Sequence, residues 1–325
     1  MSRLTLAAAL ALALAAPLSH AQEQFPSRQI NVVNPNSPGG MSDIISRAVT
    51  GSLQRSFKQP VITTSRVGAG GAVGAAYVAN QPADGYTVLL NTVTHCLIPI
   101  TDRVLGRPSA FQLDDFMLLA RLTSDPLLFV VNPSVPAKTV EEFISYAKSK
   151  PGEVVFSSTG LYGSAHITMA MFMRAAGISL RHVPANGAGP AITAVLGNHA
   201  QTTHAPVGVA TPHIQAGRVR LLAQSGEKRV AAFADTPTIK EAGYGAELAL
   251  WVGFFAHAKT PPAAVKAWQA ALREASQDAD FKAALAKLNV TTDYLDGPAL
   301  QAWYAGELKR LDAEVRAIGK IAGVK

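Results

Sequence analysis

NPNSPGGMSDIISRAV, residues 34–49, joins a short β-branched run to an apolar pattern with helical spacing. The run QINVVN (29–34) leads into it, and apolar side chains between residues 42 and 57 recur three and four positions apart. Two prolines and a pair of glycines mark a turn between the two patterns. A strand, a glycine-rich turn and a helix in this order form the repeating unit of α/β sheets, so we predict an α/β fold.

The same alternation of strand-like and helical patterns continues on both sides of this stretch. Strand-like runs follow at 60–65 and 86–92, and a second series of alternating patterns begins with LLFVVNPS at 127–134. The last hundred residues add the strand-like run LALWVGFFAHAKTP and two long helices, from Pro262 to about Leu288 and from Pro298 to about Gly319. We predict a parallel sheet in each of two lobes: residues 22–124 with 224–325 in a discontinuous lobe 1, and 125–223 in lobe 2.

The N-terminus has the pattern of an export signal. MSRLTLAAALALALAAPLSHA, residues 1–21, places Arg3 before an apolar run and ends with small residues at the positions that a signal peptidase reads. The apolar run is short and rich in alanine, which is unlike a membrane-spanning helix. We therefore expect an exported protein that is cleaved near Ala21, with an uncleaved membrane anchor as the alternative.

Charge and cysteine content exclude several classes of function. The formal net charge is +7, it becomes +6 without Arg3, and the Lys and Arg residues do not form a run of five or more. Nucleic acid is therefore not an expected partner, whereas scattered positive charge suits small anions. Cys96 is the single cysteine, so neither an internal disulfide nor a cysteine-based metal site is expected, and Cys96 is predicted to be a buried small apolar residue.

A second loop resembles the first. SSTGLYGSAHITMAMFM, residues 157–173, again passes from a strand through a Gly- and Ser-rich turn into a helix. The first N–H groups of a helix lack intrahelical acceptors and carry the positive end of the helix dipole, which favours an anion. The two loops also carry hydroxyl groups and contain neither Arg nor Lys. We expect a carboxylate between the lobes, read by backbone N–H groups and hydroxyls.

Several motifs together resemble the Bug family of periplasmic solute receptors, the TctC-type subunits of tripartite tricarboxylate transporters. The matching stretches, in order, are SPGGMSD, VGAGGAVGAAYVANQPADGYTVLL, STGLYGSAH, ITAVLGNHA, PHIQAGRVRLLA and DTPTIKEAGY. The resemblance implies a two-lobed type II periplasmic binding protein of the Venus-flytrap kind, monomeric and without catalysis or cofactor. It also implies a membrane transporter as partner and a carboxylate held between Asn36–Asp43 and Thr159–His166, frequently through two bridging waters.

The chain departs from the family pattern where the far end of a ligand is expected. Asn36 replaces an aromatic residue, Ala185 and Asn186 replace Tyr followed by Lys or Arg, and QTTHAPVG (201–208) replaces an Asp-x-x-Phe pattern. We expect a second carboxylate or another acceptor at the far end of the ligand, in a pocket lined by Asn36, Thr92, Thr94, Asn186, Thr203 and His204. Met41, Tyr162, Pro206 and Val207 are expected to flank an apolar spacer such as an aromatic ring. His204 is interpreted either as a donor that gains a charge opposite that acceptor at mildly acid pH, or as a structural residue. The candidate ligand-binding residues are Asn36, Ser37, Met41, Ser42, Asp43, Thr92, Thr94, Thr159, Tyr162, Gly163, Ser164, Asn186, Thr203, His204 and Pro206.

Three patterns in the sequence resemble enzyme or metal sites. Ser164, His166 and Asp43 suggest a hydrolase triad, and a secreted α/β hydrolase is the alternative function, but no G-x-S-x-G elbow surrounds Ser164. GAGGAVG at 68–74 resembles a dinucleotide loop, yet Val73 stands at the last glycine position, so tight packing is the better interpretation. His199, His204 and His213 lack the spacing of a zinc site, and no metal is expected.

Overall fold

The computed structural model describes residues 25–319, so the predicted export signal, residues 1–21, lies outside the described residues. Its strands are β1 (Ile30–Asn34), β2 (Val61–Ser65), β3 (Thr87–Thr92), β4 (Phe116–Val131), β5 (Val155–Ser158), β6 (Arg181–Pro184), β7 (Thr202–Pro206), β8 (Arg220–Gln224), β9 (Ala249–His257) and β10 (Thr292–Leu295). Its α-helices are α2 (Met41–Phe57), α3 (Ala72–Ala79), α4 (Thr94–Val104), α5 (Val140–Ser149), α6 (Ser164–Ala176), α7 (Ala188–Leu196), α8 (Val207–Gln215), α9 (Pro262–Gln277), α10 (Ala279–Ala286) and α11 (Gly297–Ile318).

The strands pair in the order β2-β1-β3-β9-β4-β7-β5-β6, and β8 and β10 also pair with β4. At the two ends of this order the pairs are parallel, as predicted: β1 with β2 and β3, and β5 with β6 and β7. The middle differs from the prediction, because β9 runs antiparallel to β3 and β4, and β4 runs antiparallel to β7. The fold is thus α/β with a mixed sheet.

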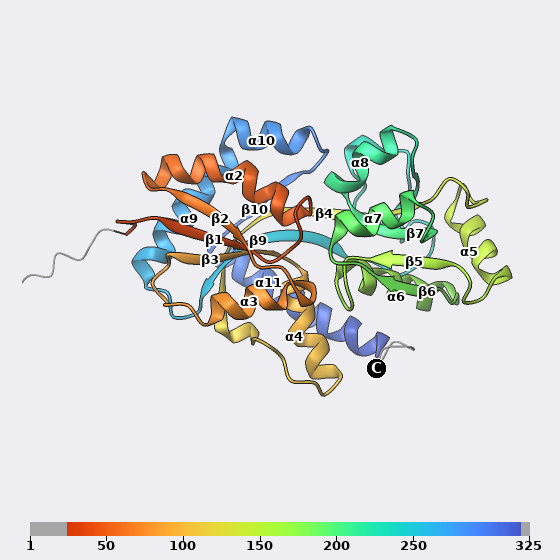
Figure 1. Ribbon diagram of the computed structural model, residues 1–325, viewed down its shortest axis with the longest axis horizontal. Coiled ribbons are helices and arrows are strands. Elements are labelled where there is room, and N and C mark those ends of the chain that lie inside the picture. Colours follow the sequence, from red (N-terminus) through yellow and green to blue (C-terminus); the bar gives the residue numbers. More distant parts are fainter. Residues whose placement is uncertain (1–24, 320–325) are drawn as a thin grey trace, which may run out of the picture.

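Strand β4 passes through both halves of the molecule. Up to Pro126 it pairs with β9, and from Leu127 onward it pairs with β7 and β8. Figure 1 shows two groups of elements on either side of this change of partner. We call them lobe 1 (β1–β3, β9, β10, α2–α4 and α9–α11) and lobe 2 (β5–β8 and α5–α8). The predicted boundaries at 124/125 and 223/224 lie close to this change and stay a prediction.

Ser225 ties together the segments that pass between the lobes. Its N–H donates to Leu127 O (2.8 Å) and its Oγ accepts from Leu127 N (3.0 Å). The same Oγ donates to Leu248 O (2.8 Å), while Leu248 N donates to Ser225 O (2.8 Å). Beside it, a Cβ at Gly226 would lie only 2.8 Å from Pro126 Cβ, so the two segments are in close contact. The crossing point is therefore an ordered set of hydrogen-bonded strands.

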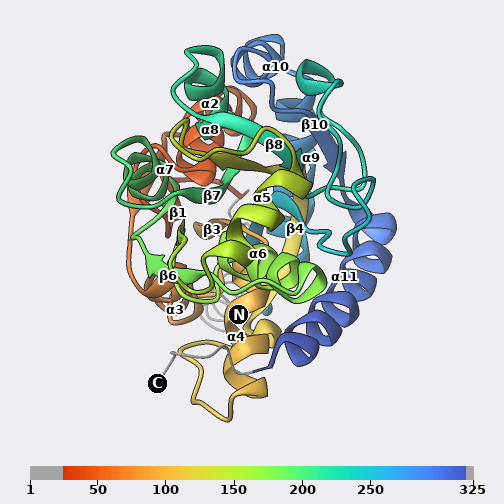
Figure 2. The ribbon, with the colours of Figure 1, turned by 90° about the vertical axis from the view of Figure 1, so that its right-hand side faces the viewer.

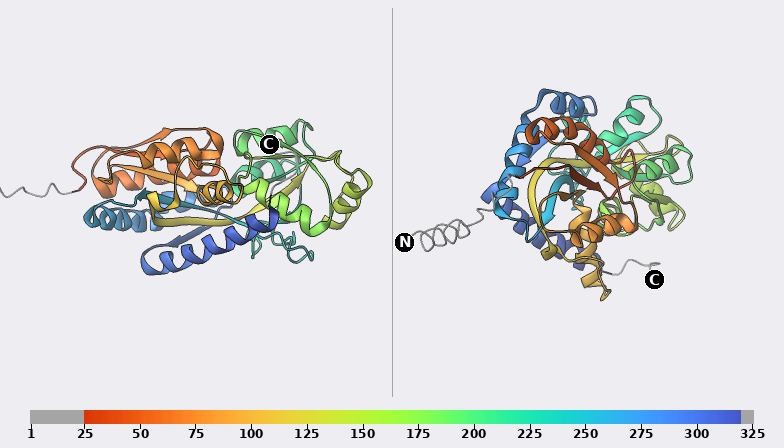
Figure 3. Two further views of the ribbon diagram at one scale, coloured as in Figure 1. Left: turned by 90° about the horizontal axis from the view of Figure 1, so that it is seen from below. Right: turned by 60° about the vertical axis from the view of Figure 1, so that its left-hand side comes forward.

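Helices cover both faces of the lobe 2 strands, as Figure 2 shows. On β4, Leu128 and Val130 pack with α7 and α8, whereas Phe129 and Val131 pack with α5 and α6. This follows from the alternation of side chains along a strand. Helix α11 runs along one side of lobe 1 toward lobe 2 (Figure 3), where it reaches α6 through the Arg174–Glu314 ion pair (3.4 Å).

Two further expectations on local structure had different outcomes. Cys96 is fully buried, as predicted, with Sγ 3.3 Å from Tyr304 Oη. The long helix expected between Pro262 and Leu288 is instead α9 and α10, separated at Asp278. Asp278 has an extended backbone, and its carboxylate caps the second helix by accepting from Phe281 N (3.0 Å). Within residues 25–319, no helix is both long and apolar enough to cross a membrane.

Candidate functional site

A small chamber of about 30 Å³ lies where five helices begin. Its wall includes the N-terminal residues or caps of α2, α4, α6, α7 and α8, namely Gly40, Met41, Ser42, Thr94, Ser164, Gly187, Ala188 and Pro206. The remaining wall residues are Asn36, Ser37, Thr92, Thr159 and Leu250. Helices α2 and α4 belong to lobe 1 and the others to lobe 2, so both lobes aim helix N-termini at one point.

The chamber has the electrostatics of an anion site. Helices α2, α6, α7 and α8 have no side-chain cap hydrogen bond. At the start of α4, Thr92 Oγ1 accepts from Thr94 N (3.3 Å), and elsewhere Thr139 and Asp278 cap α5 and α10. Backbone N–H groups in the first turns of the four uncapped helices are therefore left for another acceptor. The wall residues include no ionisable side chain, so the positive potential comes from helix dipoles. Such a site suits a carboxylate or a similar small anion.

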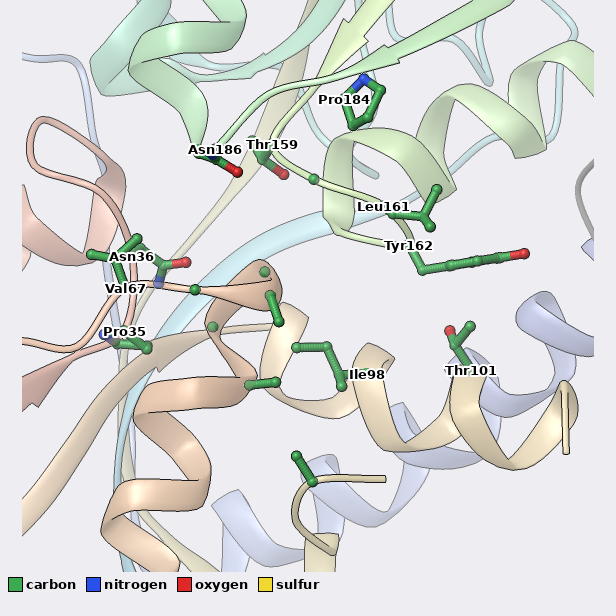
Figure 4. Close-up of a pocket in the computed structure, with 18 of the residues that line it drawn as sticks. Pro35, Asn36, Val67, Ile98, Thr101, Thr159, Leu161, Tyr162, Pro184 and Asn186 are labelled. Carbon is green, nitrogen blue, oxygen red and sulfur yellow. The ribbon is translucent and has the colours of Figure 1, made fainter. Parts of the chain in front are cut away.

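A larger cavity of about 700 Å³ borders the chamber, and Asn36, Ser37, Thr159 and Gly187 line both. Lobe 1 contributes the segment Val67–Ala72, residues of α4 and the loop that follows α4, and lobe 2 contributes Thr159–Tyr162 and Pro184–Gly187. Figure 4 shows these two groups facing each other across the cavity. Most of the wall is apolar or glycine, which suits the carbon skeleton of a ligand.

The lobes touch at the junction of chamber and cavity. Ser37 Oγ of lobe 1 donates to the backbone oxygen of Asn186 in lobe 2. Gly187 (φ +109°) lies against the same serine, so a Cβ there would be 2.7 Å from Ser37 Oγ and 2.8 Å from Ser37 Cβ. Nearby, a Cβ at Gly160 would lie 3.7 Å from Gly70 Cα of the other lobe. These contacts describe a closed cleft.

Asn36 belongs to a polar network at the base of the first loop. Its Nδ2 donates to Ser42 Oγ (2.9 Å) and to Asn91 Oδ1 (3.2 Å). Ser42 Oγ in turn donates to Asn34 Oδ1 (2.8 Å). Backbone groups join the network, since Asn36 N donates to Asn34 Oδ1 (3.1 Å) and Thr92 N to Asn91 Oδ1 (2.8 Å). The first loop is thus held to β1 and β3 by side-chain amides.

Two stacked histidines support the second loop. The rings of His166 and His182 are 4.0 Å apart and nearly parallel, at 11°. His166 Nδ1 accepts from Tyr162 N (2.8 Å), and His182 Nε2 lies 2.7 Å from Ser158 Oγ. Burial lowers the pKa of His166 to about 3 and that of His182 to about 4, so both rings are neutral near pH 7. A neutral His166 keeps Nδ1 free to accept the Tyr162 N–H.

Arg107 and Asp102 are the charged residues in the wall of the larger cavity. Arg107 donates to Asp102 Oδ1 from Nε (3.1 Å) and Nη2 (2.8 Å), and its guanidinium carbon lies 5.4 Å from the centre of the Tyr162 ring. Arg107 Nη1 has no hydrogen-bond partner among residues 25–319. The Arg107 guanidinium is therefore a cation in the cavity wall, and the Asp102 carboxylate balances part of its charge.

The structure brings most of the sequence-predicted residues to these two spaces. The chamber receives Asn36, Ser37, Met41, Ser42, Thr92, Thr94, Thr159, Ser164 and Pro206, and the larger cavity receives Tyr162 and Asn186. Gly163 is the N-cap of α6 but not a wall residue. Asn36, Thr92 and Thr94 were expected at the far end of the ligand; in the structure they surround the chamber instead.

Asp43, Thr203 and His204 do not reach the walls of either space. Asp43 Oδ2 accepts from Gly39 N (3.0 Å) and Arg47 Nε (3.1 Å), so its carboxylate fixes the first loop. Thr203 Oγ1 donates to Ser157 O (2.8 Å) inside the sheet.

His204 lies in the core of lobe 2, which does not fit the interpretation of a ligand donor. Its ring is 1% exposed and stacks on Phe129 with centroids 5.0 Å apart and planes at 18°. Burial lowers the pKa of His204 to about 3. The expected gain of charge at mildly acid pH therefore does not occur at this position, and the structural alternative fits.

The sequence did not single out several wall residues. Arg107, Asp102, Thr101 and Ile98 were missed, as was the role of the Val67–Ala72 segment. The glycine-rich stretch GAGGAVG (68–74) could have indicated the Val67–Ala72 part of the wall, but its glycines predicted only tight packing. The helix starts at α4, α7 and α8 were also missed as anion-binding termini, although Thr94, Asn186 and Pro206 lie at or beside them.

The hydrolase alternative has no support in the geometry. Ser164 Oγ makes no hydrogen bond to His166, whose Nδ1 already accepts from Tyr162 N and whose Nε2 is buried without a partner among the described residues. Asp43 interacts with Gly39 and Arg47 instead of a histidine. Within residues 25–319, no cluster of three His, Cys, Asp or Glu side chains could hold a metal ion.

Comparison with known proteins agrees with this geometry. Residues 45–320 match the family described as tripartite tricarboxylate transporter family receptor. The chain is 30% identical over 309 residues to BugT of Bordetella pertussis, covering 94% of this chain and 93% of that protein.

Among solved structures, MatC from Rhodopseudomonas palustris with bound malate superposes with a TM-score of 0.81 at 25% identity, covering 91% of this chain and all of that one. Rpa4515 of R. palustris with adipate gives 0.80 at 26% identity, covering 90% and 97%. The matched family is one of transporter receptors, not of enzymes. The chain belongs to the TctC family of periplasmic solute receptors, which includes the Bug proteins.

Proposed function

We propose that this receptor binds a dicarboxylate in the closed cleft and delivers it to the membrane subunits of a tripartite tricarboxylate-type transporter. The first carboxylate occupies the chamber, the carbon skeleton lies in the larger cavity, and a second carboxylate or other acceptor faces Arg107. The observation that carries the proposal is the convergence of five helix N-termini, those of α2, α6, α7 and α8 without a side-chain cap, on one uncharged chamber. Export to the periplasm, cleavage near Ala21 and a monomeric state belong to the same proposal.

The shape of the larger cavity supports an extended ligand with an apolar middle. Ile98, Leu161, Pro184 and Tyr162 line it, so an aromatic ring such as that of a phthalate-type acid suits its walls. The free Nη1 of Arg107 is the cationic donor available at a distance from the chamber. The two structural neighbours with malate and adipate also hold dicarboxylates.

A thermal-shift screen with mono- and dicarboxylates tests this function. A ligand present at 100 times its dissociation constant is expected to stabilise the native protein by about 2.7 kcal/mol. We expect dicarboxylates with four to eight carbons, or with an aromatic ring, to raise the melting temperature more than their monocarboxylate analogues. No shift with any carboxylate would contradict the proposal. Equal shifts for mono- and dicarboxylates would contradict the role of a second carboxylate in binding.

Replacing Ser164 with alanine tests the chamber directly. Ser164 Oγ lines the chamber and makes no hydrogen bond to another described residue, so it is free to donate to a carboxylate. A hydrogen bond to a charged group contributes about 1.5–3 kcal/mol, so Ser164→Ala should weaken binding roughly 10- to 100-fold with little change in folding stability. Calorimetric titration measures this, with Ser179→Ala, at an exposed position of the same lobe, as control. Unchanged affinity in Ser164→Ala would remove this serine from the site.

A further inference from the structure

The orientation of the Asn36 side-chain amide is fixed by two backbone donors. The N–H groups of Asn36 and Thr92 can only donate, so the atoms that they reach on Asn34 and Asn91 are carbonyl oxygens. Ser42 Oγ donates its single proton to the Asn34 oxygen and is left as an acceptor toward Asn36. The Asn36 atom between Ser42 Oγ and Asn91 Oδ1 therefore meets two acceptors, and only its NH₂ group satisfies both.

Both protons of the Asn36 amide are consequently used inside lobe 1, and the carbonyl oxygen is left over. No described residue donates to Asn36 Oδ1. Figure 4 shows this oxygen turned toward the larger cavity, on the side that faces Thr159 and Asn186. Asn36 lines both the chamber and the cavity, so its oxygen lies at their junction. A ligand atom directly next to a carboxylate held in the chamber reaches this junction.

We propose that Asn36 Oδ1 accepts a hydrogen bond from a hydroxyl group beside the anchored carboxylate, so that the receptor selects 2-hydroxy acids. When the ligand has a plain CH₂ group at this place, the Asn36 amide oxygen is left without a donor. The analogue that lacks the hydroxyl therefore binds more weakly. This inference rests on the proposed carboxylate function and specifies the ligand further.

A hydroxyl fits the junction better than an ammonium group. The residues shared by chamber and cavity are Asn36, Ser37, Thr159 and Gly187, and none carries a negative charge. Asp43, the acidic residue of the first loop, already accepts from Gly39 N and pairs with Arg47. A buried ammonium group would lack a counter-ion, whereas a neutral hydroxyl needs only an acceptor.

Calorimetric titration of matched acids tests the inference: succinate with malate, glutarate with 2-hydroxyglutarate, and 3-phenylpropanoate with 3-phenyllactate. For pairs that bind, we expect the hydroxy acid to bind about tenfold more tightly, and aspartate to bind more weakly than malate. In Asn36→Leu the ratio of the two affinities should fall to about one. Thr94→Val, an isosteric change at another wall residue of the chamber, should weaken both acids of a pair equally and keep the ratio.

The outcomes separate this inference from the function on which it rests. Equal binding of an acid and its 2-hydroxy derivative by the wild type would overturn the role of Asn36 and leave a carboxylate receptor. A preference that persists in Asn36→Leu would assign the hydroxyl to another residue. Failure of every acid to bind would overturn the carboxylate function, and the inference with it. Equal wild-type affinities overturn the inference even where Asn36→Leu does not fold.

Discussion

Gly187→Ala is expected to weaken ligand binding roughly 10- to 100-fold by preventing the lobes from meeting. The added Cβ would lie 2.7 and 2.8 Å from Ser37 Oγ and Cβ, closer than such atoms approach. Because Cβ is fixed to the backbone, rotation of the Ser37 side chain cannot relieve the contact. Overpacking of this kind costs about 1–3 kcal/mol, and here it raises the free energy of the closed conformation. Calorimetry measures the affinity, and solution scattering measures the ligand-induced decrease in radius of gyration.

Two variants separate this contact from backbone strain at Gly187. Gly243 also has a positive φ (+90°), and a Cβ there meets no atom within 4 Å, so Gly243→Ala should cost folding stability without changing affinity. Ser37→Gly combined with Gly187→Ala removes the colliding Cβ and should restore part of the lost affinity. Wild-type affinity in Gly187→Ala would show that ligand binding does not need the contact between Ser37 and Gly187.

His204→Phe is expected to stabilise the protein, and the gain should grow as the pH falls. Burial lowers the pKa of His204 to about 3, whereas a histidine in an unfolded chain has a pKa near 6.5. Below about pH 6.5 the unfolded state therefore binds a proton that the native state does not, and stability is lost as the pH falls from 6.5 toward 3. The cost is about 1.4 kcal/mol per pH unit, or roughly 2 kcal/mol at pH 5.0.

The local packing makes phenylalanine a suitable replacement. His204 already stacks on Phe129, and neither of its ring nitrogens has a partner among the described residues. Urea unfolding at pH 7.5 and 5.0 gives the stability difference between wild type and variant, which should be larger at pH 5.0 by roughly 2 kcal/mol. His199→Phe, at an exposed position, should stay within about 0.5 kcal/mol of the wild type. A difference that does not change with pH would mean that His204 becomes protonated in the native state.

Local patterns predicted the elements that build the two loops. The expected strands at 29–34, 60–65 and 86–92 and the helix at 42–57 agree with β1, β2, β3 and α2 within one residue at every end. Their signals are local, because alternation, helical spacing and turn residues act within a few positions of the chain. The two loops whose glycines and hydroxyls predict an anion site do meet at one chamber, through Ser42 and Ser164.

Properties that depend on distant partners could not be predicted in the same way. Strand β4 was expected to start near residue 127, because Asp125 and Pro126 interrupt its apolar pattern, yet its first half pairs with β9 over eleven residues, Phe116–Pro126. His204 looked like a ligand donor because its sequence neighbours are polar, whereas its actual neighbour, Phe129, is 75 residues earlier in the chain. The direction in which Asn36 presents its amide likewise depends on Asn91, which belongs to another strand.

The chamber's dependence on peptide groups affects how the receptor can evolve. A site made from an arginine is lost when one codon changes, but the N–H groups at the starts of α2, α4, α6, α7 and α8 survive replacement of the side chains around them, proline apart. Mutations in the wall of the larger cavity can therefore alter which solute is accepted while the anchor for its carboxylate persists. A receptor encoded by a duplicated gene can therefore change its ligand through single substitutions in the larger cavity, while the chamber still binds the carboxylate.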